Sequence, residues 1–324
     1  MNVLVTGGAG YIGSHAVKML QAANHHVVVV DNLSTGFTAA LDETTPFYNI
    51  SIHHQAQLTD ILLKENIEAV LHFAAFSLVG ESVEKPLKYY HNNVEGTRAL
   101  LAAMQEADVD TLIFSSTAAV YGEQRDMPIS EDASLVPTNP YGQTKKTIED
   151  MLHAMHVAHP NFNYVSLRYF NVAGAYHDGS IGENHNPETH LIPNVIKSVL
   201  NDQNTLKVFG TDYPTKDGSA VRDYIHVEDL IDAHIKALEY VKKHHVSDVF
   251  NLGSASGYSV LDIIQTTKDV LEVSVPFEKH PRRAGDPPVL IASHGKAAKI
   301  LNWHPTYTLK DMIKSAANYY EKRR

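Results

Sequence analysis

The sequence has no cysteine among its 324 residues. Disulfide bonds, thiolate catalysis, cysteine-ligated zinc sites and iron–sulfur clusters are therefore excluded. No apolar run approaches the roughly 20 residues that a membrane-spanning helix needs, so we expect no membrane partner. The chain opens M-N-V-L-V-T-G-G, with no charged leader or cleavage site. We therefore expect a cytoplasmic protein.

The sequence also has fewer basic than acidic side chains. Against 37 Asp and Glu there are only 27 Lys and Arg, which gives a formal net charge of −10 at pH 7. Nucleic-acid binding needs clustered Lys and Arg, so we expect no nucleic-acid partner. A small anionic ligand would need local cationic contacts. The length suggests two packed domains, or one large domain with a smaller lobe.

Twenty histidines raise the question of a metal site. They include adjacent pairs at 25–26, 53–54 and 244–245, and H-x-x-H pairs at 153–156 and 156–159. The sequence has no H-E-x-x-H motif, and no carboxylate stands at ligand spacing beside a pair. We predict solvated surface histidines and no metal site.

Short β-branched runs alternate with longer helical patterns through the first half of the chain. The predicted strands are Val3–Thr6, Val27–Asp31, Phe47–Ile52, Ala69–Ala74, Thr111–Ser116 and Tyr164–Phe170. The predicted helices are Tyr11–Ala23, Gln55–Glu65, about Pro86–Ala107 and Pro140–His159. This alternation predicts an α/β fold with a doubly wound, Rossmann-type parallel sheet and helices on both faces.

The alternation of strands and helices ends after Asn171, and a polar segment runs from Ala175 to His190. Beyond it we predict helices at Leu191–Asn201, Val227–Lys243, Val260–Leu271 and Asp311–Lys322, and a strand at Leu206–Phe209. We therefore expect a first domain at 1–174 and a smaller, mixed α/β C-terminal lobe at 175–324. The boundary is soft, because later segments can return to the first domain.

A glycine-rich turn, T-G-G-A-G-Y-I-G, joins the first predicted strand and helix. Gly7, Gly10 and Gly13 would let the backbone approach a pyrophosphate at a helix N-terminus. A plain strand–helix turn could also use them. Asp31 follows eighteen residues after Gly13, where a carboxylate would bind the adenosine ribose. No arginine follows among residues 32–34, which favours NAD over NADP.

Tyr141 and Lys145 are four residues apart, a spacing expected about once by chance in this chain. Asn139 is a good N-cap and Pro140 suits the first helical position. Tyr141 would then lie in the first turn, with Lys145 on the same face. The helix dipole and the ammonium group should both lower the pKa of the tyrosine. A surface pair is the alternative.

Three hydroxyl residues follow a strand that we place in the middle of the sheet. Ser115, Ser116 and Thr117 stand at its carboxyl end, where ligands of doubly wound sheets bind. One hydroxyl there could hydrogen-bond a substrate hydroxyl. A strand-end turn of small polar residues is equally compatible.

The glycine turn, the hydroxyl after S-S and Y-x-x-x-K together resemble the extended short-chain dehydrogenase/reductase family. Further segments narrow the resemblance to the UDP-glucose 4-epimerases. These are V-G-E-S-V-E-K-P (79–86), Y-Y-H-N-N-V (89–94), L-R-Y-F-N-V-A-G-A (167–175), V-R-D-Y-I-H-V-E-D-L (221–230) and P-R-R-A-G-D-P (281–287).

The resemblance implies an NAD-dependent isomerase that interconverts UDP-glucose and UDP-galactose. Oxidation at C4, rotation of the 4-keto sugar and return of the hydride would invert that carbon. Tyr141 would be the base and Thr117 would hydrogen-bond O4. Lys145 would bind the nicotinamide ribose and lower the pKa of Tyr141.

The resemblance also implies the remaining contacts. Those to the cofactor are Gly7, Gly10, Tyr11, Ile12, Gly13, Asp31, Asn32, Phe73, Ala74, Asn92, Tyr141, Lys145 and Tyr169. Those to the UDP-sugar are Thr117, Asn171, Leu191, Arg222, Arg283, Asp286 and Leu290. The helices beginning at Pro86 and Pro140 resemble the pair that forms a dimer interface in the family, so we expect a homodimer. The alternative is that they only cover the sheet.

Some alternatives stay open. Sugar-nucleotide dehydratases and decarboxylases carry acidic residues just after the threonine, where this chain has Ala118 and Ala119. They are therefore disfavoured. A non-catalytic NAD-binding regulator would have the same fold. Acceptance of N-acetylated sugars is open, because Leu290 is intermediate in size. Ile50 and Ser51 replace the family's usual adenine contact, so we hypothesise weaker NAD binding.

Overall fold

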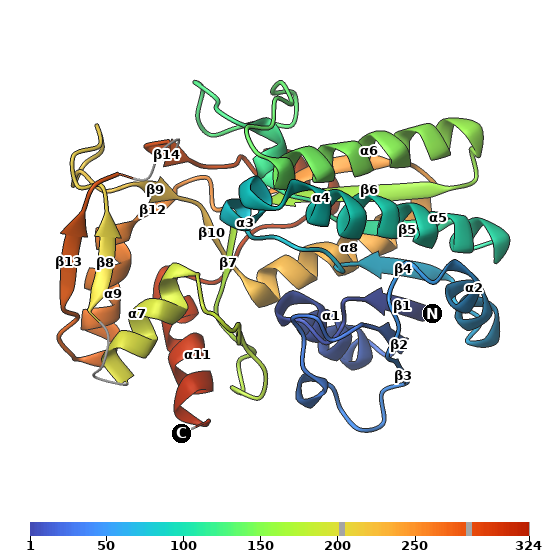
Figure 1. The fold of residues 1–324 in the computed structure, drawn as a ribbon, viewed down its shortest axis with the longest axis horizontal. Helices are drawn as coiled ribbons and strands as arrows, with labels where there is room; N and C mark the ends of the chain where they lie inside the picture. The colour runs from blue at the N-terminus through green and yellow to red at the C-terminus, as the bar shows by residue number, and fades with distance from the viewer. Residues whose placement is uncertain (201–204, 283–286, 324) are drawn as a thin grey trace.

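The computed structural model describes residues 1–200, 205–282 and 287–323. Its largest sheet has seven parallel strands in the order β11-β6-β5-β4-β1-β2-β3 (Figure 1). They are β1 (Asn2–Thr6), β2 (His26–Val30), β3 (Phe47–Tyr48), β4 (Ala69–His72), β5 (Thr111–Ser115), β6 (Asn163–Tyr169) and β11 (Asp248–Leu252). The predicted doubly wound α/β fold is confirmed.

Helices cover both faces of this sheet and bury a separate core on each. On one face lie α1 (Tyr11–Ala22) and α8 (Val227–His244), and on the other α2 (Gln55–Lys64), α5 (Gly96–Glu106) and α6 (Pro140–Ala158). Side chains of β1 alternate between the two cores, with Val3 and Val5 in the first and Leu4 in the second. Burial on both faces explains why these strands are continuously apolar.

The strand order reverses between β1 and β4, which are hydrogen-bonded neighbours. Ligands of open parallel sheets bind outside the carboxyl ends of the strands at such a switch point. The glycine turn follows β1 and Phe73 follows β4, so the predicted cofactor contacts lie at this place. As predicted, β5 is near the middle of the sheet.

The strand β11 comes from beyond residue 174 and pairs with β6, so a later segment enters the first sheet. One feature differs from the sequence expectation. The predicted long helix is continuous but divides into α4 (Pro86–Tyr89), a π-helical turn (Tyr90–Glu95) and α5, after a short helix α3 (Val79–Glu84). The domain division at residue 174 stays a prediction.

The remaining elements form a second lobe, with its own core, to the left in Figure 1. Its helices are α7 (Leu191–Leu200), α9 (Val260–Leu271) and α11 (Leu309–Glu321). Its strands are β8 (Leu206–Phe209) with β13 (Phe277–His280), and β9 (Val221–Arg222) between β12 (Tyr258–Ser259) and β14 (Val289–Leu290). Between the lobe and the main sheet, β7 (Asn171–Ala173) pairs with β10 (Tyr224–His226). A last helix, α10 (Gly295–Leu301), packs in the first core.

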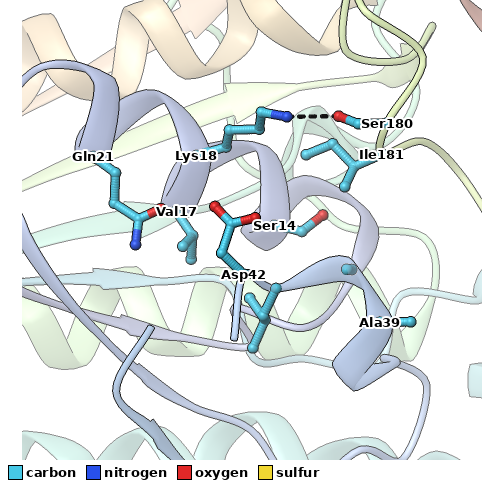
Figure 2. Close-up of a pocket in the computed structure, with 10 residues that line it drawn as sticks. Ser14, Val17, Lys18, Gln21, Ala39, Asp42, Ser180 and Ile181 are labelled. Atoms are coloured by element: carbon cyan, nitrogen blue, oxygen red, sulfur yellow. Dashed lines mark hydrogen bonds between the residues drawn. The ribbon is translucent and has the colours of Figure 1, made fainter. Parts of the chain in front are cut away.

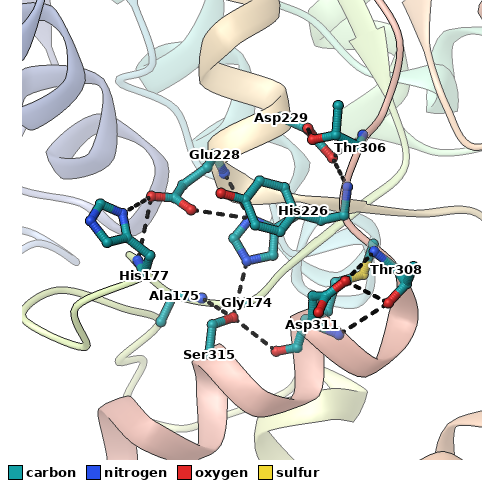
Figure 3. A network of polar contacts seen from close by, with 12 residues as sticks. Gly174, Ala175, His177, His226, Glu228, Asp229, Thr306, Thr308, Asp311 and Ser315 are labelled. Carbon is teal, nitrogen blue, oxygen red and sulfur yellow. Dashed lines mark hydrogen bonds and ion pairs between the residues drawn. The ribbon is translucent and has the colours of Figure 1, made fainter.

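A polar network anchors the chain where it leaves β7 (Figure 3). Gly174 has a φ of +92°, and a Cβ there would lie 2.6 Å from the His226 ring. The Ser315 hydroxyl of α11 accepts from the Ala175 N–H and lies 3.0 Å from His226 Nε2. His177 Nδ1 lies 2.7 Å from a Glu228 carboxylate oxygen. The network therefore ties this bend to the start of α8 and to the middle of α11.

No helix of the described residues is both long and apolar enough to span a membrane. The cytoplasmic location stays a prediction.

Candidate active site

The glycine turn can only be built with glycine. Gly7 has a φ of +75°, and a Cβ there would lie 2.6 Å from the Ala74 backbone nitrogen. A Cβ on Gly13 would lie 2.0 Å from the Gly7 carbonyl oxygen. Gly10 is the N-cap of α1, and no side chain of the described residues caps that helix. The N-terminus of α1 thus has no side-chain cap, which fits a dinucleotide diphosphate bound there.

Asp31 is held directly beside this turn. Its two carboxylate oxygens accept hydrogen bonds from the Ala9 N–H at 3.0 Å and the Leu33 N–H at 2.8 Å. Burial raises the pKa of Asp31, and these two bonds oppose the rise. The neighbouring Asn32 is exposed, and its side chain accepts from the Ser34 N–H. The carboxylate keeps lone pairs that could accept from ribose hydroxyls.

The other predicted cofactor contacts around the turn have protein partners. The Tyr11 hydroxyl donates to the Gly174 carbonyl oxygen at 2.7 Å. Ile12 is partly buried against the core below α1. The Phe73 ring centre lies 4.9 Å from that of His234 on α8. These contacts fix the turn to β4, α8 and the start of the polar segment.

Tyr141 lies at the start of α6, as predicted. Asn139 is the N-cap, and its side chain accepts from the Gly142 N–H at 2.9 Å, while Pro140 is the first helical residue. Tyr141 is hydrogen-bonded to the side chain of Thr117. A Cβ on Gly142 would lie 2.6 Å from the Ala119 carbonyl oxygen. The first turn of α6 is thus in backbone contact with the segment after β5.

Thr117 is itself held in place. It is the N-cap of the short 3₁₀ helix η3 (Ala118–Tyr121), and its hydroxyl accepts from the Ala119 N–H at 3.1 Å. Thr117 is only 6% exposed. The predicted pair of a phenol and a hydroxyl at the carboxyl end of β5 is therefore present in the structure.

Lys145 is buried one turn after Tyr141. Its Nζ donates to the Ser115 carbonyl oxygen at 2.7 Å. The Ser115 hydroxyl shares a short hydrogen bond with the hydroxyl of Tyr169, the last residue of β6. Burial raises the pKa of Tyr169, and nearby Tyr141 adds to the rise. These four side chains therefore lie together.

The pKa of Tyr141 shifts in the direction opposite to our expectation. Burial raises it, and the hydrogen bond with Thr117 opposes the rise without cancelling it. Burial also lowers the pKa of Lys145 to about 7, although Glu149 opposes that change, so its charged form is less favoured than that of an exposed lysine. The expected lowering by the helix dipole and Lys145 is wrong in this structure, because burial is the larger effect.

The π-helical turn brings an unpredicted residue to the site. Asn93 is fully buried, and its amide bonds both backbone groups of Phe76 and donates to the Thr144 hydroxyl on α6. The predicted cofactor contact Asn92 donates to the Asn93 side-chain oxygen at 2.9 Å. Asn93 thus joins the loop after β4 to the helix that carries Tyr141. The single extra residue of a π-turn is common at functional sites.

Several predicted UDP-sugar contacts meet around a buried aspartate. The Asn171 amide donates to the Asp223 carbonyl oxygen at 3.1 Å, and Leu290 pairs with Arg222 in neighbouring strands. The Asp223 carboxylate accepts from the N–H and hydroxyl of Ser254 and from the Ala292 N–H. Sequence reasoning missed this aspartate, which joins three separate segments.

Leu290 also packs against the small core around η3, whereas Leu191 starts α7 and packs in the core of the second lobe. The predicted contacts Arg283 and Asp286 lie outside the described residues.

A buried ion pair lies behind the catalytic helix. The Glu149 carboxylate accepts from Arg168 Nε at 3.0 Å and Nη2 at 2.5 Å, and from the Ser116 hydroxyl at 2.5 Å. Arg168 Nη1 also donates to the Tyr121 hydroxyl, which donates to the Asn251 side chain of β11. We call this set the Glu149–Arg168 network. Sequence reasoning missed it, because its members are far apart in the chain.

A second ionic group occupies the polar segment before α7. Glu183, His185, Glu188 and His190 form what we call the 183–190 cluster. Burial lowers the pKa of both histidines, but the two carboxylates outweigh it and raise the values to about 9 and about 10. The adjacent and H-x-x-H histidine pairs do not include this group, because its histidines alternate with glutamates along the sequence.

The prediction of solvated surface histidines is also wrong in part. His15, His72, His226 and His234 are at most 2% exposed. Burial lowers the pKa of each, to between about 3 and about 4, so they are neutral core residues.

A surface pocket beside α1 is separate from the predicted site (Figure 2). It is lined by residues of α1, of the loop around residue 40 and of the polar segment. Lys18 crosses it and donates to the Ser180 hydroxyl at 2.6 Å. None of the predicted cofactor or sugar contacts lines it.

Comparisons with known proteins agree with this geometry. Residues 3–253 match the model of the NAD dependent epimerase/dehydratase family. The UDP-glucose 4-epimerase of Lactobacillus helveticus is 51% identical over 99% of this chain and 97% of its own. A crystal structure of the Brucella ovis UDP-glucose 4-epimerase with NAD superimposes with a TM-score of 0.96 at 45% identity, covering 98% of both chains.

The Bifidobacterium longum UDP-glucose 4-epimerase, solved with NAD⁺ and UDP, has a TM-score of 0.93 and 38% identity, covering 99% of this chain and 98% of the other. The family match, the near-complete alignments and the fold agree, and the chain belongs to the NAD dependent epimerase/dehydratase family.

Proposed function

We propose that this chain interconverts UDP-glucose and UDP-galactose by inverting C4 of the hexose, with NAD as cofactor. The observation that carries the proposal is the grouping of Thr117, Tyr141 and Lys145 at the carboxyl end of β5. The grouping occurs in a chain that aligns almost end to end with UDP-glucose 4-epimerases.

The residues at the switch point would hold NAD. Asp31 would accept from the adenosine ribose, the glycine turn would bind the diphosphate, and Lys145 would reach the nicotinamide ribose. Lys145 gives one N–H to the Ser115 carbonyl oxygen, and its amino group keeps at least one further N–H to donate in either protonation state. When bound, NAD supplies the hydride acceptor, and the positive charge of its oxidised nicotinamide favours a phenolate nearby.

Tyr141 would move the proton at O4. Its phenolate removes the proton of the 4-hydroxyl as C4 is oxidised, and its phenol returns a proton when the other face of the keto sugar is reduced. Thr117, already hydrogen-bonded to Tyr141, would orient O4. Burial keeps water from competing for the same proton.

The second lobe would hold the UDP part of the substrate. We propose residues 1–174 as the NAD-binding domain and 175–324 as the UDP-sugar lobe, with α8 and β11 returning to the first. Arg222 and Arg283 would bind the diphosphate, with Asn171 beside them, since guanidinium groups match phosphate oxygens. Asp286 would bind the uridine ribose. Leu191 and Leu290 would contact the sugar.

Related chemistries are less well supported. In η3, Ala118 and Ala119 stand where dehydratases and decarboxylases would need carboxyl groups, and alanine transfers no proton. A non-catalytic NAD-binding regulator has no need for the buried group of Thr117, Tyr141 and Lys145.

The test is an epimerisation assay with added NAD. Incubation with UDP-galactose deuterated at C4 should give UDP-glucose that keeps the label, because the hydride that leaves C4 returns to it. UDP-N-acetylgalactosamine is tested in parallel, to define the tolerance for acetylated sugars. Absence of product from both sugars, in protein that binds NAD, would contradict the proposal.

We also propose a homodimer through α3, α4 and α6. Val79 and Val83 of α3 and Leu87 of α4 are 45%, 62% and 80% exposed, and α3 packs beside both α4 and α6. Exposed apolar groups gathered on one face are typical of interfaces. Sedimentation should give a dimer at micromolar concentration, and Leu87→Asp should shift it toward monomer. A wild-type monomer would exclude the dimer.

A further inference from the structure

The 183–190 cluster has a composition that the proposed reaction does not use. One ligand-type atom from each of its four residues lies within 4.8 Å of all the others. Within the described part of the chain, no other group of three or more His, Cys, Asp or Glu residues is gathered so closely. Its members are two imidazoles and two carboxylates, which are common ligands of transition metals.

The two imidazoles converge on the same carboxylates. His190 Nδ1 lies 2.6 Å and His185 Nδ1 3.1 Å from Glu183 Oε1. The same nitrogens lie 3.5 and 3.8 Å from Glu188 Oε1. Both nitrogens are shielded from solvent, and their contacts with the carboxylates are ion pairs that lack hydrogen-bond alignment. Close approach without hydrogen-bond alignment is what ligand atoms around one ion show.

The distances match a tetrahedral ion. Zinc binds histidine nitrogen and carboxylate oxygen at about 2.0–2.2 Å, which puts neighbouring tetrahedral ligands about 3.3–3.5 Å apart. The observed separations of 2.6 to 3.8 Å span this value. Two carboxylates balance the charge of a divalent ion, which matters because Glu183 is only 4% exposed. Lys197 Nζ lies 3.4 Å from the other oxygen of Glu188, Oε2.

We propose that the 183–190 cluster is a structural binding site for a divalent transition-metal ion, with zinc preferred. Four protein ligands and no open position are typical of structural zinc sites. Magnesium and calcium prefer oxygen ligands, and the two imidazoles disfavour them.

Surrounding groups already orient the ligands. The N–H groups of Thr189 and His190 donate to Glu188 Oε1 at 2.9 and 3.0 Å. The Tyr320 hydroxyl of α11 donates to the Glu183 carbonyl oxygen at 2.7 Å. Outer contacts of this kind hold metal ligands in position. A bound ion would therefore fasten the polar segment at the point where α7 begins.

The ion would act on binding rather than on the chemical step. Leu191, a proposed sugar contact, directly follows the cluster. If the proposed function is correct, removing the ion should raise KM for UDP-galactose and change kcat little. Metal content and thermal stability report on the site whether or not that function is correct.

The experiment uses the full chain, freed of any affinity tag, stripped with EDTA and titrated with zinc near neutral pH. Glu183→Gln and His190→Asn remove one ligand each. His177→Asn is the matched control, since His177 is on the same segment and pairs with a single glutamate, Glu228, at 2.7 Å. Circular dichroism and NAD binding check that each variant is folded.

We expect about one zinc per wild-type chain after gel filtration, as for other four-ligand sites. The His177→Asn control should retain the same amount of zinc as the wild type. Both ligand variants should lose more affinity than the roughly 10–100-fold that follows loss of an outer contact. Zinc should raise Tm of the wild type and the control only. Cobalt(II) should give the strong visible absorption of a tetrahedral site.

Two outcomes would overturn the proposal. If the wild-type protein retains no zinc and gives no tetrahedral cobalt spectrum, the cluster is a set of ion pairs and not a metal site. This outcome can be read from the wild-type protein alone. Equal zinc uptake by Glu183→Gln, His190→Asn and the wild type would place the metal elsewhere.

Discussion

The Glu149–Arg168 network and the 183–190 cluster both gather charged side chains, but they differ in burial and in how their polar atoms are paired. In the network, Glu149 has three donors, and Arg168 also has the Tyr121 hydroxyl. None of its side-chain atoms is among the unpaired buried atoms of the described residues. In the cluster, two imidazole nitrogens lie in ion-pair contact with carboxylates but without hydrogen-bond alignment.

This difference separates a structural role from a binding role. A buried charge whose partners are all supplied by the chain has nothing left to offer a ligand, and it fixes geometry. A group with unused ligand atoms can still take up an ion. The network ties Ser116, next to Thr117, to the helix of Tyr141 and to β11. The following predictions test each side of this contrast.

Tyr141→Phe should have the largest effect. Loss of a general acid–base group should lower kcat for UDP-galactose by about 10²–10⁴-fold. Zinc uptake by the 183–190 cluster should not change. Initial rates with saturating NAD check the first expectation. Tyr90→Phe, on the π-helical turn, is the control, and a Tyr141→Phe activity within tenfold of wild type would show that another group moves the proton.

Arg168→Met should destabilise the fold strongly. It leaves the Glu149 carboxylate buried without its partner, which typically costs about 3–5 kcal/mol. Lys146→Met on the same helix is the control, since it breaks only the exposed pair with Asp150 and should cost less than about 1 kcal/mol. Urea unfolding measures both. Equal losses would mean that the network is no more important than a surface pair.

Lys145→Met should remove a pH dependence of stability. The pKa of Lys145 is about 7 in the folded chain and about 10.4 when unfolded. Between these values the unfolded state binds more protons, so stability rises with pH. The variant should lose this rise, by more than about 1 kcal/mol between the two limits. Unfolding at several pH values, with Lys146→Met as control, measures it, and parallel wild-type and variant curves would contradict it.

His185→Gln should have the smallest effect in the absence of metal. Its ring is partly exposed, so loss of its ion pairs should change stability by about 1 kcal/mol or less in EDTA. Excess zinc should stabilise the wild type through binding to the folded state but not the variant. Thermal scans with and without zinc measure the difference. An equal response of both proteins to zinc would remove the contrast between the two groups.

The order of elements was predictable because strands buried on both faces are continuously apolar. Local signals also predicted the position of Tyr141, since Asn139 is a good N-cap and Pro140 suits the first helical position. β11 was not predicted: D-V-F-N-L is short, and its partner β6 ends nearly 80 residues earlier. Asp223 was missed for a similar reason, because its partners Ser254 and Ala292 are distant in sequence.

The pKa of Tyr141 shows a different limit. A sequence indicates that a lysine and a helix start are near the phenol, but not how much water the fold removes from both. Burial reversed the expected direction and also lowered the pKa of Lys145.

The close packing of Gly142 against Ala119 limits which parts of the candidate site can vary in sequence. Because no side chain fits between these two backbones, Thr117 and Tyr141 form one rigid part. Leu191 and Leu290 belong to other elements. Natural variation or engineering can therefore change the proposed sugar contacts while Thr117 and Tyr141 keep their spacing.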